Sequence, residues 1–332
     1  MKKWILGIGI SGIAVYFLFK NFDINEFARL EGKIRWEILP LLFLSNLWAF
    51  LPFALRWQYL LEKKIGFWSS LSSAVIGVGL NMLLPARGGD VVRLMINKRE
   101  TNLPLTNLVS KIFLEKVMDL GSVVLVGATV LFLLGLGQSK NLSLLFLSTL
   151  VITGMILGLL AIRYFLEPIR SLFRKLFSII GKQELYDTRF DHQVVEFSEF
   201  LRGDKLAKPL LISLPTWVCG YAISYWLAGQ LIGMEISFLE ALLFMFLGGM
   251  GVAIPSAPSG IGVFHAALIS GFLILGRDSG EGFVYATVVH LTQFVILTIL
   301  ALVFYLIWIF FKGDKSLSKG LDDVRGGLDK LD

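Results

Sequence analysis

Residues 251–266 read GVAIPSAPSGIGVFHA and break an otherwise apolar region with prolines and glycines. Proline lacks a backbone N–H and glycine weakens a helix, so no continuous helix is expected from Pro255 to Gly262. At membrane depth, backbone groups without helical partners are tolerated only where protein or a water-filled cavity surrounds them. We therefore expect a half-helix that restarts near Ile261, with its N-terminal N–H groups facing such a cavity. The simpler alternatives are a kinked span and a loop outside the membrane.

A second break lies in the first half of the chain, where residues 81–93 read NMLLPARGGDVVR. Here too an apolar helix meets a proline and glycines before a new helix begins. The two breaks align loosely, with Pro85 opposite Pro258 and Gly89 opposite Gly262. Interrupted hydrophobic segments in matching positions of two halves point to a transporter site near the bilayer midplane. The pair therefore indicates an internal repeat, which is inverted if the two breaks open to opposite sides.

The composition is that of a membrane protein. Of 332 residues, 55% are hydrophobic and 17% are charged, whereas charged residues make up about 25% of a typical soluble domain. The single cysteine, Cys219, cannot form an internal disulfide, and no basic–aromatic patch suggests a nucleic-acid partner. The formal net charge of +6 suits a protein with basic cytoplasmic loops. We therefore expect an all-α, polytopic membrane protein.

Eight apolar segments can be placed in the membrane, where a helix needs about 20 residues to cross about 30 Å of hydrocarbon. Six are expected to be full spans, and their ranges are 4–19, 36–61, 105–137, 142–162, 209–233 and 283–311. The other two, residues 67–97 and 238–276, are expected to be re-entrant or broken hairpins. For the first hairpin, a full span over 67–84 followed by an external loop is the alternative. No small-x-small cleavage site follows the first apolar run before Lys20, so this run is expected to remain as a span.

Lysine and arginine are concentrated in the segments that this layout assigns to the cytoplasm, which places both termini inside and the protein in the inner membrane. The whole chain, residues 1–332, forms a single membrane domain in this interpretation. It carries a cytoplasmic insertion at 163–208 and a cytoplasmic tail at 312–332. Apolar residues of the insertion recur at helical spacing and predict an interfacial amphipathic helix. They are Ile169, Leu172, Phe173, Leu176, Phe177 and Ile180. A short soluble helix is expected over residues 194–201.

Three charged residues share one face of a predicted span. Lys111, Glu115 and Asp119 are spaced four residues apart, which puts them in line on a helix. A charged group in the middle of a span costs about 2.5–3.5 kcal/mol on insertion scales, so this stripe should face protein or water and not lipid. It is either functional or part of an ion-pair network that anchors the helix, through Arg87 or Arg93.

Arg87, Asp90 and Arg93 flank the first break. Arginine binds phosphate through two parallel hydrogen bonds, and Gly88 and Gly89 let backbone N–H groups approach the same oxygens. The N-terminus of the half-helix adds a partial positive charge. Together these features predict a site for an anionic lipid head group. The alternative is that the arginines are ordinary basic residues of a cytoplasmic loop.

Two of the three histidines lie near the second break or in the last span. His265 follows the break directly, and His290 lies mid-span with Gln293 about one turn further on. A histidine inside a membrane can relay protons or hydrogen-bond a polar ligand, although a buried structural histidine is an equally good interpretation. The pair has no neighbouring carboxylate pattern for a metal, and the sequence contains no recognisable nucleotide or hydrolase motif. We expect no metal, no cofactor and no enzymatic activity.

At these positions the chain resembles the flippase-like family that includes the transmembrane region of lysylphosphatidylglycerol synthase. Residues 84–93, LPARGGDVVR, are similar to its Pro-x-Arg-x-Gly-Glu-x-x-Arg pattern, with Asp90 at the acidic position. Residues 114–119, LEKVMD, resemble its Glu-Arg-x-x-Asp helix, and residues 258–264, PSGIGVF, resemble its Pro-Gly-Gly-x-Gly-x-Phe loop. The resemblance includes the final span and extends over roughly residues 4–311.

The resemblance implies a protein that moves an anionic phospholipid or a polyprenyl-phosphate-linked lipid across the inner membrane. In that case, Arg87 and Arg93 would hold the phosphate from the cytoplasmic side, while Glu115 and Asp119 would pair with them or with a cationic head group when the site is empty. The opposite gate would be formed at the second break. The residues expected to contact the lipid there are Pro258, Gly260, Gly262, His265, His290 and Gln293.

Two other functions stay open at this point. A membrane enzyme would act on a lipid head group with Glu115, Asp119 and His265 as its acid–base residues. A non-transporting partner would organise a lipid-modifying complex. The soluble aminoacyl-transferase domain of the synthase is not recognisable in this sequence, so that activity is not carried over.

Overall fold

The computed structural model describes residues 32–84, 87–137, 143, 145–146, 149–154, 157, 166–181, 183–191, 195, 207–253 and 260–312. All regular elements in these ranges are helical, as the composition predicts. In the first half they are η1 (Trp36–Ile38), α3 (Leu39–Leu60), α4 (Phe67–Leu83), α5 (Gly88–Thr101) and α6 (Leu105–Gly137). In the insertion they are α8 (Leu166–Ile179), α9 (Gln183–Leu185) and η3 (Tyr186–Phe190). In the second half they are α11 (Ala207–Pro215), η4 (Thr216–Tyr221), α12 (Ala222–Leu231), α13 (Phe238–Ala253), α14 (Val263–Ile274) and α15 (Ser279–Lys312).

Four helical segments are long and apolar enough to cross a membrane. They are Trp36–Leu60, Leu105–Gly135, Ala207–Leu231 and Ser279–Phe311. These segments match four of the six predicted full spans to within a few residues, in position, length and apolarity. The predicted span 4–19, most of the predicted span 142–162 and the tail beyond Lys312 lie outside the described residues.

The outer surfaces of these spans are apolar. Only 33–50% of the residues in their most apolar windows are buried inside the protein, and the outward positions carry large hydrophobic side chains. On α3 these include Leu44, Trp48 and Leu55, and on α15 they include Leu302 and Leu306. A contiguous apolar surface of this extent is expected where a protein faces lipid. The fold is therefore that of an α-helical membrane protein.

Both predicted helix breaks are confirmed, and each one separates two helices that pack together as a hairpin. In the first hairpin, α4 ends at Leu83 and α5 begins at Gly88, and the two helices are in contact. In the second, α13 ends at Ala253 and α14 begins at Val263, close to the predicted restart. The helix α5 continues to Thr101, beyond the predicted end of the hairpin at residue 97.

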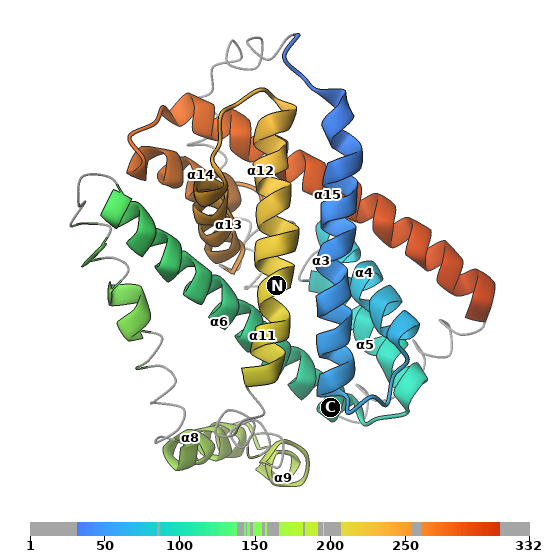
Figure 1. The fold of residues 1–332 in the computed structure, drawn as a ribbon. Coiled ribbons are helices and arrows are strands. Elements are labelled where there is room, and N and C mark those ends of the chain that lie inside the picture. Colours follow the sequence, from blue (N-terminus) through green and yellow to red (C-terminus); the bar gives the residue numbers. More distant parts are fainter. Residues whose placement is uncertain are drawn as a thin grey trace.

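The two hairpins lie on opposite sides of the bundle. In Figure 1, the α13–α14 hairpin is found on one side of the neighbouring helices α3 and α12, and the α4–α5 hairpin on the other. The long helix α15 packs against both α4 and α14, so one span connects the two broken elements. This arrangement places a helix break on each side of a common core.

Glycines set the close packing of the first hairpin. A Cβ atom on Gly89 would collide with the carbonyl oxygen of Gly77, and a Cβ atom on Gly77 would lie 2.9 Å from Cβ of Arg93. On the opposite face of α4, a Cβ atom on Gly79 would collide with the backbone of Leu297 in α15. The sequence suggested that Gly89 opens the backbone to phosphate. In the structure, its missing side chain lets α5 approach α4, as small residues do in packed membrane helices.

The span over residues 207–231 is one rod made of three segments, α11, η4 and α12. Pro215 ends α11 and has no N–H to donate, so the regular hydrogen-bond ladder is interrupted there and a π-helical turn, η4, follows. Gly220 in this turn lies so close to Ala49 of α3 that a Cβ atom would be 2.5 Å from the alanine Cβ. The helical segment 207–231 therefore packs closely against α3 at η4.

The predicted amphipathic helix of the insertion is confirmed as a helix, α8, over Leu166–Ile179. Its apolar residues Leu172, Phe173 and Leu176 are exposed, whereas Phe177 packs against Tyr186 of η3 with ring centroids 5.4 Å apart. The helix predicted over 194–201 lies almost entirely outside the described residues. Before that region, α9 and η3 follow directly after α8. In Figure 1, α8 lies beyond the lower end of α11.

Candidate functional site

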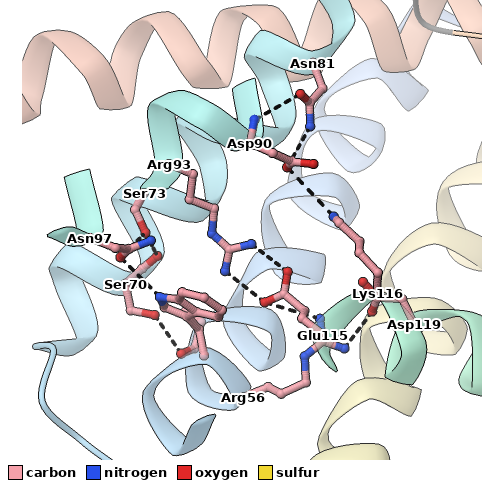
Figure 2. Close-up of polar contacts among 12 residues, drawn as sticks. Arg56, Ser70, Ser73, Asn81, Asp90, Arg93, Asn97, Glu115, Lys116 and Asp119 are labelled. Carbon is pink, nitrogen blue, oxygen red and sulfur yellow. Dashed lines mark hydrogen bonds and ion pairs between the residues drawn. The ribbon is translucent and has the colours of Figure 1, made fainter. Parts of the chain in front are cut away.

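Four charged side chains from three helices meet beside the first hairpin. We call them the buried charge cluster, and its members are Arg56 of α3, Arg93 of α5, and Glu115 and Asp119 of α6. Figure 2 shows how they face one another. Close packing of α3, α5, α6 and α11 brings them together although they are far apart in the sequence.

Arg93 and Glu115 form the centre of this cluster. The Nη1 atom of Arg93 donates to Oε1 of Glu115 at 2.6 Å, and its Nη2 atom donates to Oε2 at 2.9 Å. Both side chains are buried. The guanidinium group also lies over the ring of Trp57 at 4.2 Å and over that of Phe53 at 4.8 Å. Arg93 is therefore fixed by aromatic rings and by a two-pronged ion pair.

Arg56 is the member that the sequence did not reveal. Its Nη1 atom donates to Oδ1 of Asp119 and to Oγ of Ser213, both at 2.6 Å. Its Nη2 atom lies 3.7 Å from Oε2 of Glu115, which is beyond hydrogen-bond distance. The available signal was the presence of an arginine inside the predicted span 36–61, because such a charge needs an acidic partner.

A polar rim surrounds the start of α5 and consists of Asn81, Asp90 and Lys116. Asn81 Nδ2 donates to Asp90 Oδ1 at 3.0 Å, and the backbone N–H of Asp90 donates to Asn81 Oδ1 at 3.2 Å. Lys116 Nζ lies 3.9 Å from the same carboxylate. The side chains of Asp90 and Lys116 are 16% and 32% exposed. The rim thus connects the buried charge cluster to the surface.

The remaining charged residues predicted at the first break occupy different environments. Arg87 is exposed and stands directly before α5, with a left-handed backbone conformation at φ 57°. Lys111 is buried on the same face of α6 as Glu115 and Asp119, so the predicted stripe does turn towards protein. The structure therefore brings Arg93, Glu115 and Asp119 together, places Asp90 at the rim and leaves Arg87 at the surface.

The residues predicted at the second break form a separate group on α14 and α15. The rings of His265 and His290 have centroids 5.2 Å apart, and the ring of Phe264 lies 5.9 Å from the first and 5.1 Å from the second. His265 is buried, and its Nδ1 atom has no hydrogen-bond partner among the residues that the structure describes. Gln293 is half-buried on the next turn of α15.

The turn into α14 is shaped by two glycines. Gly260 and Gly262 have φ angles of 74° and 91°, a region that side chains with a Cβ atom rarely adopt. Pro258, which was predicted as part of this site, lies outside the described residues. Within the described ranges, no group of three or more His, Cys, Asp or Glu side chains is arranged to hold a metal ion.

The charges around the first break do not balance. The basic residues of the buried charge cluster, the rim and the N-terminal end of α5 are Arg56, Arg87, Arg93 and Lys116, and the acidic ones are Asp90, Glu115 and Asp119. The excess of positive charge suits an anionic ligand. Buried ion pairs often stabilise a protein no better than apolar side chains of similar size, because desolvation offsets their attraction. A contribution to stability alone therefore does not explain why these positions carry buried charges.

A family model described as the lysylphosphatidylglycerol synthase TM region matches residues 4–301. Comparisons with curated proteins and with solved structures gave no significant match.

Proposed function

Because the chain belongs to the family of the lysylphosphatidylglycerol synthase transmembrane region, a membrane domain related to lipid handling, we propose that it moves an anionic lipid between the leaflets of the membrane. The lipid is an anionic phospholipid or a polyprenyl-phosphate-linked lipid. The observation that carries this proposal is the buried charge cluster beside the break between α4 and α5. Ionisable residues inside a membrane domain are costly and mark substrate or ion pathways.

The cytoplasmic end of the pathway is the first break. Arg87 is exposed there and makes first contact with the phosphate, and Asp90 and Lys116 line the way inwards. Arg93 is buried further along α5, and its planar guanidinium group can donate hydrogen bonds to two phosphate oxygens. The excess of positive charge around these residues favours an anionic head group over a zwitterionic one.

The opposite end of the pathway is the second break. His265 and His290 provide hydrogen-bonding groups beside aromatic rings. Gly260 and Gly262 allow the tight turn before α14. The two hairpins act as the two gates of an inverted repeat, and a rocking motion between them gives alternating access. The histidines and carboxylates would carry protons if transport is proton-coupled.

The proposed orientation follows from the distribution of basic residues. The protein lies in the inner membrane with both termini in the cytoplasm, and α8 lies at the cytoplasmic surface. An enzymatic role for Glu115, Asp119 and His265 receives less support, because both carboxylates are engaged by arginines.

The site is tested by a single substitution at its exposed end. Purified protein is reconstituted into liposomes that contain fluorescent phosphatidylglycerol or fluorescent phosphatidylcholine, and leaflet exchange is followed by chemical quenching of the outer leaflet. We expect Arg87→Ala to slow the exchange of phosphatidylglycerol several-fold. Lys98→Ala is the matched control, because Lys98 is a basic residue in the last turn of the same helix. Equal rates for the two variants would contradict the placement of the site.

A further inference from the structure

One carboxylate oxygen of the buried charge cluster lies between two arginines. Oε2 of Glu115 accepts a hydrogen bond from Nη2 of Arg93 at 2.9 Å, and Nη2 of Arg56 lies 3.7 Å away from the same oxygen. The first distance is that of a hydrogen bond and the second is not. Glu115 is thus bound to one guanidinium group and adjacent to a second one, as Figure 2 shows.

The second guanidinium group has unused donors. Nε and Nη2 of Arg56 have no hydrogen-bond partner among the described residues, although the side chain is fully buried. Nη1 of the same group is held by Asp119 and Ser213, so the position of Arg56 is fixed. An unsatisfied buried donor is unfavourable. The protein therefore keeps an unused donor directly beside a carboxylate that is already paired elsewhere.

The position that Glu115 occupies on Arg93 is the one that a phosphate needs. Carboxylates and phosphates both bind a guanidinium group through two parallel hydrogen bonds, and the edge formed by the two Nη atoms is one that either can use. Glu115 uses both Nη atoms of Arg93, so a phosphate cannot bind there in the same way until the carboxylate has left. Arg93 itself is held by the rings of Trp57 and Phe53, and this leaves the carboxylate as the group that moves.

We propose that Glu115 is a movable occupant of the anion site, which passes from Arg93 to Arg56 when a lipid phosphate binds Arg93. The proposal rests on the proposed function and assigns Arg56 the role of a positioning residue. Before the exchange, Glu115 neutralises Arg93 in the empty site. After it, the phosphate is paired with Arg93 and the carboxylate with Arg56, so each of these charges keeps a partner. The surrounding excess of positive charge accommodates the added anion.

Two variants should change lipid affinity in opposite directions. Glu115→Gln removes the charge of the competing group and leaves Arg93 available, so the affinity for an anionic lipid should rise about tenfold. The double variant Arg56→Gln with Asp119→Asn removes one positive and one negative charge and keeps amide hydrogen bonding between the two positions. It deprives Glu115 of its second site, so the affinity for an anionic lipid should fall about tenfold.

The experiment is a titration of short-chain phosphatidylglycerol into each purified protein in a neutral detergent, followed by calorimetry. Short-chain phosphatidylcholine is the control ligand, and Lys98→Ala is the control variant. Opposite shifts of the dissociation constant in the two variants support the proposal. Shifts in the same direction, or none, overturn it. If the double variant does not fold, Glu115→Gln alone decides, because weaker or unchanged binding contradicts the exchange.

Failure of the exchange and failure of the proposed function give different results. If wild-type protein binds phosphatidylglycerol no better than phosphatidylcholine, the proposed function is contradicted, and the exchange falls with it. If wild-type protein prefers phosphatidylglycerol and the variants do not shift in opposite directions, only the exchange is wrong.

Discussion

Arg93 and Glu115 face each other across the interface of α5 and α6. Nη1 of the arginine donates to Oε1 of the carboxylate at 2.6 Å, and Nη2 donates to Oε2 at 2.9 Å. This pair fastens a short polar helix, α5, to a long apolar span, α6. It also occupies an arginine that is buried within the first hairpin. The pair therefore has a structural effect and a proposed functional one, and the two can be separated by substitution.

Removal of one partner should destabilise the protein strongly. Arg93→Ala removes both hydrogen bonds of the buried Glu115 carboxylate to Arg93, and loss of one member of a buried ion pair costs about 3–5 kcal/mol. Thermal unfolding in detergent would show this as a clear fall in the transition temperature. Lys98→Ala, on the same helix, should leave that temperature nearly unchanged. Equal transition temperatures for the two variants would contradict the ion pair as described.

Removal of both partners should restore stability without restoring function. The double variant Arg93→Met with Glu115→Leu replaces the pair by apolar side chains, which is often neutral or stabilising in buried positions. We expect its transition temperature to lie near that of wild-type protein, while exchange of phosphatidylglycerol is lost. A double variant that transports at the wild-type rate would show that Arg93 does not bind the lipid.

The first hairpin should tolerate no side chain at Gly89. A Cβ atom there would collide with the carbonyl oxygen of Gly77, and overpacking of this kind costs about 1–3 kcal/mol. Gly121→Ala is the matched control, because the nearest atom to its added Cβ lies 3.8 Å away. Unfolding temperatures should fall for Gly89→Ala and stay unchanged or rise for Gly121→Ala. The reverse order would contradict the close contact between α4 and α5.

Replacement of His265 should separate its structural and functional roles. Its ring lies among aromatic neighbours and its Nδ1 atom lacks a partner in the described part of the chain, so His265→Phe should fold with about wild-type stability. If the imidazole serves the second gate, lipid exchange should fall several-fold in the same variant. Thermal unfolding and liposome exchange measure the two effects. Unchanged exchange in stable protein would remove His265 from the pathway.

The apolar face of α8 should lie in the membrane interface. The side chains of Leu172, Leu176 and Ile179 are exposed on this face, while Arg170 and Arg174 on another face are paired with Asp191 and Asp187. The hydrogen bonds from Arg170 lower the pKa of the Asp191 carboxyl, so this pairing persists at neutral pH and is lost only in acid.

Labelling can test the position of α8. In a Cys219→Ser background, a fluorophore attached through Leu176→Cys should be quenched by lipids that carry a quencher in the acyl chain. A fluorophore attached through Ser171→Cys, on the polar side of the helix, should be quenched much less. Equal quenching at both positions would show that the helix does not insert one face into the bilayer.

Much of the fold follows from local sequence signals. Length and apolarity predict the spans, and the prolines and glycines near residues 85 and 255–262 predict the helix breaks, because these residues act on the backbone directly. Helical periodicity also predicts that Lys111, Glu115 and Asp119 share a face that turns inwards. In each case, the residues that determine the structural feature are neighbours in the sequence.

The pairing of Glu115 with Arg93 was among the alternatives that the sequence suggested, but the other partners could not be derived in the same way. Periodicity states which face of a helix is buried but not which helix covers it, so the pairing of Arg56 with Asp119, 63 positions apart, was not foreseen. The packing role of Gly89 was not foreseen either, because the distance of closest approach between α4 and α5 is a tertiary property. The π-helical turn after Pro215 depends on how α11 and α12 continue as one rod.

The most direct test of the central claim is leaflet exchange by wild-type protein in liposomes. Vesicles with the protein, vesicles with the folded Arg93→Met and Glu115→Leu double variant, and vesicles without protein are compared for fluorescent phosphatidylglycerol and phosphatidylcholine. We predict that only wild-type protein accelerates exchange and that it does so preferentially for phosphatidylglycerol. Exchange that is no faster than in protein-free vesicles, or that is equal for the wild type and the double variant, would contradict a transport site at the buried charge cluster.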